Sequence, residues 1–263
     1  MDIFWLSFIQ GVTEFLPVSS SGHLFIASVF FSFQGLGRST EVFLNFATLI
    51  VVLVYFRLEI KELFFSFLGA LKGRFSSKFH QGLKICLATL PVIASGFLVH
   101  TYFDHLTHSF RLFGYLSIFF GGLMIISDKV GPLSKTYNQV SYKDALFIGV
   151  AQVIALIPGV SRFGISLTMS RFLGYRPFDA AKFSLLTSIP IGVGATVLLT
   201  YKASQSAYFH FGFSFFIIGL VCFVVGLLTL YFFMWWLKKR TLLIWGLYRI
   251  FLGLFILYYF NQF

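Results

Sequence analysis

The amino-acid sequence predicts an all-α polytopic membrane protein, folded as a single integral membrane domain over residues 1–263. Three observations favour this class. First, 58% of the residues are hydrophobic and only 11% are charged, whereas a typical soluble domain carries roughly 25% charged residues. Second, the mean hydropathy is +0.87, and third, apolar stretches of membrane-spanning length recur along the chain. The composition therefore excludes a soluble single-domain enzyme and a disordered chain.

About six stretches are expected to be full transmembrane helices, because a hydrocarbon core ~30 Å thick needs about 20 apolar residues in helical form. They cover residues 42–56, 83–101, 112–127, 183–201, 211–236 and 241–260. Two further apolar regions, 1–33 and 144–175, are interrupted by Pro, Gly, Ser and ionisable residues. Lipid offers no partners to freed backbone groups, so these two regions are predicted to be broken helices rather than plain spans.

The basic residues predict the orientation. Of the 20 Lys and Arg residues, 15 fall in four segments that the positive-inside rule assigns to the cytoplasm. The segments are 57–84, 129–143, 171–182 and 238–240. With this assignment, region 144–175 begins and ends inside and region 1–33 begins and ends outside. The sequence therefore predicts two re-entrant helical hairpins of opposed orientation.

The two interrupted regions share a sequence pattern. The first contains Gly11-Val12-Thr13-Glu14, then Pro17 and Ser19-Ser20-Ser21-Gly22. The second contains Gly149-Val150-Ala151-Gln152, then Pro158 and Ser161-Arg162-Phe163-Gly164. Similar sequence in opposed orientation indicates an inverted-topology repeat, with repeat one at about 1–130 and repeat two at about 140–263; such folds carry their site at the repeat interface. A chance match of small residues is the alternative.

Glu14 is the one acidic residue within an interrupted apolar region, and the other acidic residues lie at termini, loops or span edges. A carboxylate at mid-membrane depth costs ~2.5–3.5 kcal/mol, which makes it a functional candidate. Gln10 lies four residues earlier, on the same helical face. The pair is thin as a complete metal cage, but it would suit Mg²⁺ or Ca²⁺ if substrate phosphates complete the shell. The alternative is a structural Glu14 paired with Arg162 or hydroxyls.

Both interrupted regions carry groups that suit an anion. After Pro17, the hydroxyls and amides of Ser19, Ser20 and Ser21 would lie at a new helix start, which is a ready anion site, and His23 can move protons near neutral pH. In the second region, Gly159 and Ser161 precede Arg162, whose planar fork suits phosphate oxygens.

The whole set of polar groups therefore predicts binding of an anionic lipid headgroup, a phosphate or diphosphate. Arg249, also in an apolar stretch, is expected to be a snorkelling or structural residue near the end of a span. The net charge of +11 would suggest nucleic acid in a soluble protein, but the topology uses the basic residues, and no nucleic-acid partner is expected.

These motifs resemble the BacA/UppP-type undecaprenyl-diphosphatase family of bacterial membranes. The signature [E/Q]-x3-E followed by F-L-P-V-S-S-[ST]-G-H is matched by Gln10, Glu14 and residues 15–23, and P-G-x-S-R-S-G-x-T by residues 158–166. Resembling segments extend over essentially the whole chain. There are three departures: Phe163 replaces the usual Ser, Ser166 the usual Thr, and Gln10 is the neutral option at its position.

The resemblance implies hydrolysis of undecaprenyl diphosphate to undecaprenyl phosphate and inorganic phosphate, recycling of the lipid carrier for peptidoglycan synthesis, and bacitracin resistance. In this reading Glu14 and Gln10 hold the divalent cation, and Ser20 is the nucleophile with His23 as acid/base, with direct attack by water as the alternative. Arg162 stabilises the phosphoryl group. The expected substrate-binding residues are Gln10, Ser19, Ser21, Gly159, Ser161 and Ser166.

The expected location is the bacterial inner membrane, with cytoplasmic basic loops and a site open to the periplasmic side. The bilayer and the lipid substrate are the expected partners, and the sequence leaves room for a homo-oligomer. Inverted repeats also occur in transporters, so a flippase for the phosphorylated lipid carrier is the competing hypothesis.

Overall fold

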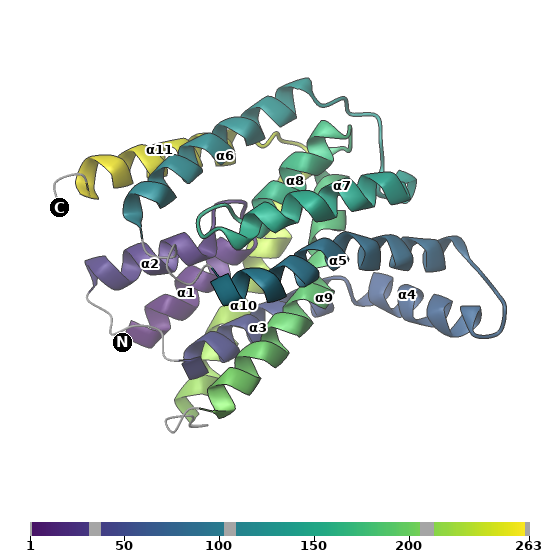
Figure 1. Ribbon diagram of the computed structural model, residues 1–263, viewed down its shortest axis with the longest axis horizontal. Helices are drawn as coiled ribbons and strands as arrows, with labels where there is room; N and C mark the ends of the chain where they lie inside the picture. Colours follow the sequence, from purple (N-terminus) through teal and green to yellow (C-terminus); the bar gives the residue numbers. More distant parts are fainter. Residues whose placement is uncertain (1, 32–37, 103–108, 206–212, 261–263) are drawn as a thin grey trace.

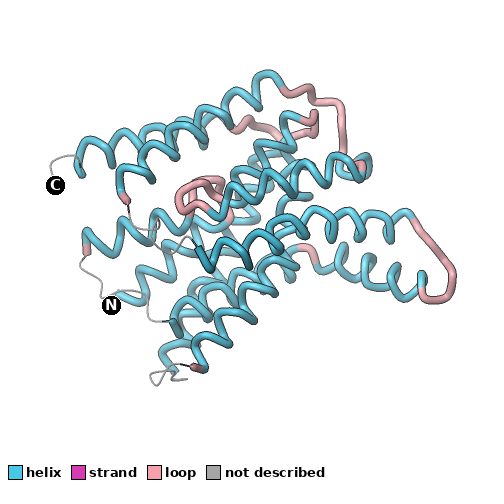
Figure 2. The backbone as a smooth tube through the Cα atoms, viewed as in Figure 1, coloured by secondary structure: helices cyan, strands magenta, loops and turns pink. Residues whose placement is uncertain are grey.

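The structure is a computed structural model that describes residues 2–31, 38–102, 109–205 and 213–260. Within these ranges the chain is helical, and β structure is limited to one isolated bridge between Lys135 and Tyr175. The all-α prediction is therefore confirmed (Figure 2). The helices are α1 (Asp2–Glu14), α2 (Ser20–Phe30), α3 (Arg38–Tyr55), α4 (Arg57–Ala70), α5 (Ser77–Tyr102), α6 (Phe110–Val130), α7 (Tyr142–Val153), α8 (Arg162–Phe172), α9 (Pro177–Ser204), α10 (Phe213–Leu237) and α11 (Leu243–Phe260), with short 3₁₀ helices η2 (Tyr137–Gln139) and η3 (Ile154–Leu156).

The six predicted spans correspond to α3, α5, α6, α9, α10 and α11. Three of these helices, α6, α9 and α10, are long and apolar enough to cross a membrane by length and composition. A fourth candidate is α3 together with α4, which are bent by 81° at their junction. The described apolar part of α11 is shorter than a full span, and α5 carries several polar and basic residues in its first half. By length and composition, the described residues therefore provide three full spans, or four if α3 and α4 form one, where about six were predicted.

Both interrupted regions are broken helices, as predicted. In the first, α1 ends at Glu14 and α2 starts at Ser20; in the second, α7 and η3 are followed by a loop before α8 begins at Arg162. The residue before each second helix has a left-handed backbone: φ is 74° at Ser19 and 69° at Ser161. No other non-glycine residue that the structure describes has a positive φ. The two breaks therefore have the same unusual local geometry.

Each broken region packs against a helix that is distant in sequence. Helix α1 packs against α10, and α7 packs against α5. Helices α6 and α11 lie side by side along one edge of the molecule, and α3 packs against both α9 and α10 (Figure 1). The largest cluster of buried hydrophobic residues lies between these helices and includes Phe15, Met124, Leu167 and Phe233. This packing holds both breaks inside the molecule.

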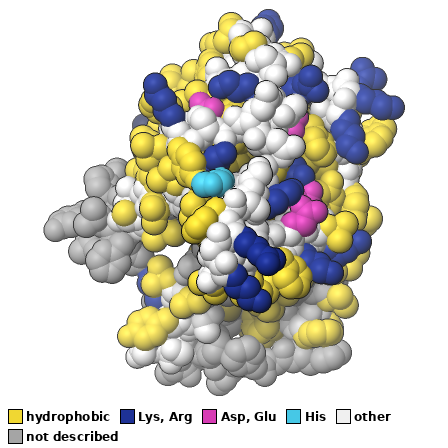
Figure 3. All heavy atoms as spheres, turned by 90° about the vertical axis from the view of Figure 1, so that its right-hand side faces the viewer, with side chains coloured by type: hydrophobic (Ala, Val, Ile, Leu, Met, Phe, Trp, Pro, Cys, Tyr) yellow, Lys and Arg dark blue, Asp and Glu magenta, His cyan; other side chains and the backbone are white. Residues whose placement is uncertain are grey.

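Basic side chains gather at one end of the molecule. Viewed from the end where α4 meets α5, Lys and Arg side chains clearly outnumber acidic ones (Figure 3). One basic residue counted with these loops has a buried side chain. Arg171 lies on α8 with a fully buried side chain, and its Nε donates to Asp128 Oδ1 at 3.1 Å. It folds inward because Asp128 and nearby carbonyl groups offer it a complete set of acceptors.

Candidate active site

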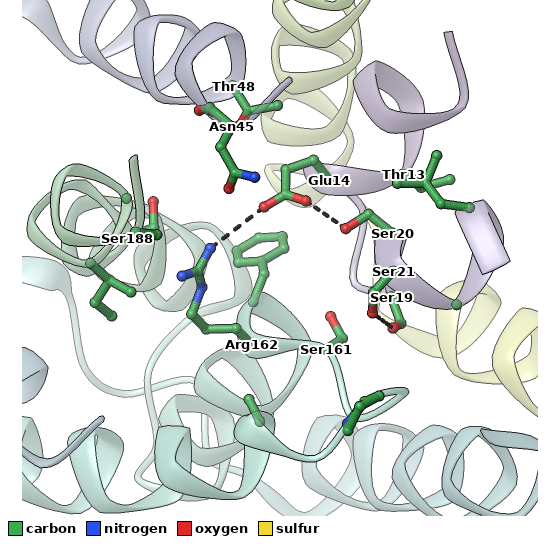
Figure 4. Close-up of a pocket in the computed structure, with 18 of the residues that line it drawn as sticks. Thr13, Glu14, Ser19, Ser20, Ser21, Asn45, Thr48, Ser161, Arg162 and Ser188 are labelled. Carbon is green, nitrogen blue, oxygen red and sulfur yellow. Dashed lines mark hydrogen bonds and ion pairs between the residues drawn. The ribbon is translucent and has the colours of Figure 1, made fainter. Parts of the chain in front are cut away.

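The two helix breaks meet at a cavity of about 1310 Å³ (Figure 4). Its walls come from α1 and α2, from the loop before α8, and from α3, α5, α6 and α9. The lining includes most of the residues nominated from the sequence, which are Gln10, Glu14, Ser19, Ser20, Ser21, Gly159, Ser161 and Arg162. Two nominated residues, His23 and Ser166, are not part of this lining. The fold thus joins the two motifs in one place.

Glu14 is the centre of the polar contacts. Its Oε2 accepts hydrogen bonds from Ser20 Oγ at 2.5 Å and from Gln10 Nε2 at 3.0 Å. Its Oε1 faces Arg162 Nη2 at 3.6 Å, with both side chains partly exposed to the cavity. Glu14 therefore links the end of α1 to the starts of both α2 and α8, and the structural pairing with Arg162 that the sequence left open is present.

The starts of α2 and α8 both border the cavity. Ser161 Oγ accepts from the amide of Gly164 at 3.1 Å and so caps α8. Ser19 precedes α2 but makes no side-chain capping bond; its Oγ lies 3.3 Å from Ser21 Oγ. Unpaired amides and the partial positive charge of a helix start favour an anion. Two such starts flank Glu14 and Arg162, so this part of the cavity suits an oxyanion.

Two residues of α11 form hydrogen bonds that support the two loops. His23 Nδ1 is 2.8 Å from the carbonyl oxygen of Ser19, and its Nε2 is 2.6 Å from Tyr248 Oη. Arg249 Nη2 donates to the carbonyl oxygen of Gly159 at 3.0 Å. Of the two roles expected for Arg249, snorkelling is contradicted by its fully buried side chain, and its bond to the Gly159 carbonyl agrees with a structural role. Helix α11 thus reaches the second loop directly through Arg249 and the first loop through His23 of α2.

Two nominated residues lie elsewhere. His23 lines a separate apolar pocket of about 410 Å³ between α1, α2 and α11, and both of its ring nitrogens are engaged. Ser166 is 1% exposed, and its Oγ has no hydrogen-bond partner within the described part of the chain. Neither side chain faces Glu14 and Arg162 in this cavity.

The opposite wall of the cavity was missed by the sequence reasoning. Asn45 and Thr48 on α3 and Ser184 and Ser188 on α9 line it, and Figure 4 places Asn45 and Ser188 beside the Glu14–Arg162 pair. These side chains are neutral, so the search for ionisable residues passed over them. Their signal was a polar residue every three or four positions within otherwise apolar spans, which gives one polar helix face.

Two oxygen donors for a divalent cation are present. Gln10 Oε1 is buried and has no hydrogen-bond partner among the described residues, and it lies on the same helical face as the Glu14 carboxylate. Carboxylate and amide oxygens suit Mg²⁺ and Ca²⁺. No cluster of three or more His, Cys, Asp or Glu side chains occurs within the described ranges. The residues therefore fit an ion whose shell a ligand completes.

Phe163 follows Arg162 and also lines the cavity. Its ring meets Phe233 of α10 edge to face, with ring centroids 5.6 Å apart. A serine here would offer a hydroxyl to the cavity, whereas this ring packs α8 against α10. The substitution therefore exchanges a polar group for a packing contact beside the arginine.

These features define a helical membrane protein with a cavity, lined by Glu14 and Arg162, between two broken helices. Comparison with known proteins gives the family: residues 3–255 match the family described as "Bacitracin resistance protein BacA". A protein of Alcanivorax borkumensis named "Undecaprenyl-diphosphatase" is 35% identical over 257 residues, covering 97% of this chain and 96% of that protein. Its namesake in Idiomarina loihiensis is 32% identical over 251 residues, covering 94% of each chain. The chain belongs to the BacA family.

Proposed function

We propose that the protein is a membrane hydrolase that removes the terminal phosphate of undecaprenyl diphosphate, giving undecaprenyl phosphate and inorganic phosphate. The family and the names of both relatives support this activity. Hydrolysis would recycle the lipid carrier for peptidoglycan synthesis and confer resistance to bacitracin. The observation that carries the chemistry is the short bond from Ser20 to Glu14 beside Arg162.

Ser20 is the nucleophile in this proposal. Its Oγ already donates its proton to the Glu14 carboxylate at 2.5 Å, the arrangement that activates a hydroxyl. As Oγ attacks the terminal phosphorus, the proton passes to Glu14 and then to solvent. The bond to the bridging oxygen breaks, and its electron pair leaves with undecaprenyl phosphate. Water then attacks the phosphorus of the phosphoserine, the P–Oγ bond breaks and inorganic phosphate leaves, and a proton from the water reaches Ser20 Oγ through Glu14.

Glu14 therefore takes the acid/base role that the sequence reasoning assigned to His23. The reason is contact: Glu14 bonds directly to Ser20, while both nitrogens of His23 are directed to Ser19 and Tyr248. We assign His23 to holding the Ser19 carbonyl, and thereby the start of α2. Direct attack by water, with Ser20 only binding phosphate, remains the competing mechanism and is tested below.

Arg162 and the two helix starts stabilise the transferring group. Phosphoryl transfer depends mainly on positioning and on charge stabilisation of the phosphoryl oxygens. The guanidinium of Arg162, the Ser19–Ser21 hydroxyls and the amides at the start of α8 all border one cavity. Glu14 and Gln10 would hold Mg²⁺ or Ca²⁺, which when bound neutralises negative charge on the diphosphate.

We also propose that the fold is an inverted-topology repeat with two opposed re-entrant hairpins. Repeat one would cover about 1–130 and repeat two about 140–263, within one integral membrane domain. Support comes from the matching left-handed residues Ser19 and Ser161 and from the packing of α1 on α10 and of α7 on α5, each of which joins one proposed repeat to the other. In this scheme α1 and α7 are counterparts, as are α10 and α5.

The basic end of the molecule is assigned to the cytoplasm by the positive-inside rule, in the inner membrane of a bacterium. The cavity would then open to the periplasmic side. Its lining extends to Glu41 in the first turn of α3 and Lys202 in the last turn of α9, which are the helix ends remote from the basic loops. Polar and charged side chains would therefore line part of the route from Glu14 towards the outer face.

The test is release of phosphate by purified protein in detergent, with a polyprenyl diphosphate and Mg²⁺ or Ca²⁺. We expect release of one phosphate per lipid and no release from the polyprenyl monophosphate. Movement of the carrier in liposomes without phosphate release would instead support the flippase hypothesis. We do not pursue that hypothesis further, because both relatives are named as diphosphatases.

A further inference from the structure

Two arginine side chains are fully buried in the described part of the molecule, and their surroundings differ. Arg171 bonds to the carboxylate of Asp128, and its guanidinium also reaches carbonyl oxygens of Asp128, Gly131 and Tyr175. Arg249 has one hydrogen bond, from Nη2 to the Gly159 carbonyl oxygen at 3.0 Å. Its Nε and Nη1 are buried and have no hydrogen-bond partner among the described residues, and none of the ion pairs between described residues includes it.

This contrast matters because a buried charge without a counter-ion is costly. Structural arginines inside membrane proteins are normally paired, as Arg171 is, and unpaired intramembrane charges mark functional sites. Arg249 therefore needs an explanation that packing does not supply. Its position gives one.

Arg249 lies directly behind the loop that holds Arg162. Besides the bond to Gly159, its Nη1 is so close to Gly164 that a Cβ atom there would lie 2.9 Å from it. Gly164 is in the first turn of α8, and its amide is capped by Ser161. Gly159, Ser161 and Arg162 line the cavity, while Arg249 does not. The guanidinium thus lies next to the start of α8, on the side of the loop that faces away from the cavity.

We propose that Arg249 is a positioning residue of the phosphate site. Its bond to Gly159 fixes the 159–162 loop, whose Gly159 and Ser161 have left-handed backbones. Its buried charge adds to that of Arg162 and to the helix start, so the loop presents a field suited to a multiply charged phosphate group. The bound anion is the counter-charge that Arg249 lacks. This inference rests on the proposed function only for the identity of the anion.

The neighbouring residue has a parallel role. Tyr248 Oη lies 2.6 Å from His23 Nε2, and His23 Nδ1 is directed at the Ser19 carbonyl oxygen. Successive residues of α11 therefore each support the carbonyl of one loop, through His23 for the first break and directly for the second. Both carbonyls belong to, or lie two residues before, a serine with positive φ.

The experiment measures binding of inorganic phosphate to purified protein by calorimetry, together with the Tm in the same detergent. For Arg249→Met we expect phosphate binding to weaken roughly tenfold or more, because a buried charge acts through a low dielectric, while the Tm stays the same or rises. Arg249→Lys should recover most of the affinity. The matched control is Arg171→Lys, which should lower the Tm and leave phosphate affinity within about twofold.

The proposal is overturned if Arg249→Met binds phosphate as the wild type does, or if Arg249→Lys binds it as poorly as Arg249→Met. In the first case the charge is irrelevant to the anion, and in the second only the shape of arginine matters. Wild-type protein that binds no phosphate would instead count against the proposed anion site as a whole. The two failures are therefore distinguishable.

Discussion

At the scale of single residues, Glu14 is the group on which the chemistry depends. Three side chains contact its carboxylate: Gln10, Ser20 and Arg162. The sequence nominated all four, because a carboxylate and an arginine in apolar segments are conspicuous. It could not tell which side chain bonds to which. The partner of Ser20 was expected to be His23, since a Ser/His pair close in sequence is a familiar arrangement, but the turn at Ser19 directs His23 away from the cavity.

The nucleophile is tested by Ser20→Ala. If Ser20 Oγ forms the phosphoenzyme, its removal should lower the rate of phosphate release at least about a thousandfold. Ser28→Ala is a matched control, because Ser28 lines the same cavity on α2 but bonds only to the Phe25 carbonyl; its rate should stay within about twofold. A Ser20→Ala protein with substantial residual activity would favour direct attack by water.

The role of His23 is tested by the pH dependence of His23→Gln. Because His23 is directed to Ser19 and Tyr248 rather than to Ser20, we expect the rate to fall by about tenfold through misplacement of α2. The shape of the profile of kcat against pH should stay as in the wild type. Tyr248→Phe should behave in the same way. Loss of one limb of the profile in His23→Gln would show that His23 transfers a proton.

At the scale of elements, the broken helices were the most predictable feature. Pro17 and Pro158 end helices, and the serines after them start new ones, so the local rules suffice. The opposite wall of the cavity was not predictable in this way. Asn45 and Ser188 lie on uninterrupted helices far from the motifs in sequence, and only the packing of α3 and α9 brings them to Glu14. The helices α5 and α11 were also predicted as full spans, but α5 carries polar and basic residues in its first half and the described apolar part of α11 is short.

The start of α7 is held at the basic end by a small cluster. Asp144 accepts from Tyr175 Oη at 2.6 Å and pairs with Lys135 Nζ at 3.3 Å. Burial raises the pKa of Asp144, but hydrogen bonds from Tyr175, Ser141 and Lys135 outweigh it, so the pKa lies below its ordinary value of 3.8. A lowered carboxyl pKa contributes stability above the ordinary pKa, and this is lost as the pH falls through the folded-state pKa.

Asp144→Asn should therefore lower the stability of the folded protein at neutral pH by about 1–3 kcal/mol, since it leaves buried groups with poorer partners. Thermal unfolding in detergent measures this as a lower Tm. On acidification, the difference in Tm between wild type and variant should shrink. Glu62→Gln is the control: Glu62 pairs with Lys78 on the surface, and its Tm should not change measurably. Equal Tm values for Asp144→Asn and wild type at neutral pH would contradict the prediction.

At the scale of the whole molecule, the basic end and the course of the cavity predict a direction in the membrane. Labelling of single cysteines with an impermeant maleimide tests it, in a background with Cys86→Ser and Cys222→Ser because Cys86 is exposed. We expect Arg74→Cys to be labelled only from the cytoplasm and Ser204→Cys only from outside. The reverse pattern would place the cavity opening on the cytoplasmic side.

The central claim is that the protein hydrolyses the lipid diphosphate in one cavity, which two broken helices build around Glu14. The most direct measurement compares phosphate release by wild type and Glu14→Gln, side by side, with undecaprenyl diphosphate and Mg²⁺ or Ca²⁺. The substitution keeps the size of the side chain and removes the base for Ser20 and the carboxylate for the cation. We predict that the wild type releases phosphate, that Glu14→Gln releases none that can be detected, and that the Tm of the variant equals that of the wild type. A Glu14→Gln protein that releases phosphate at the wild-type rate would contradict the account.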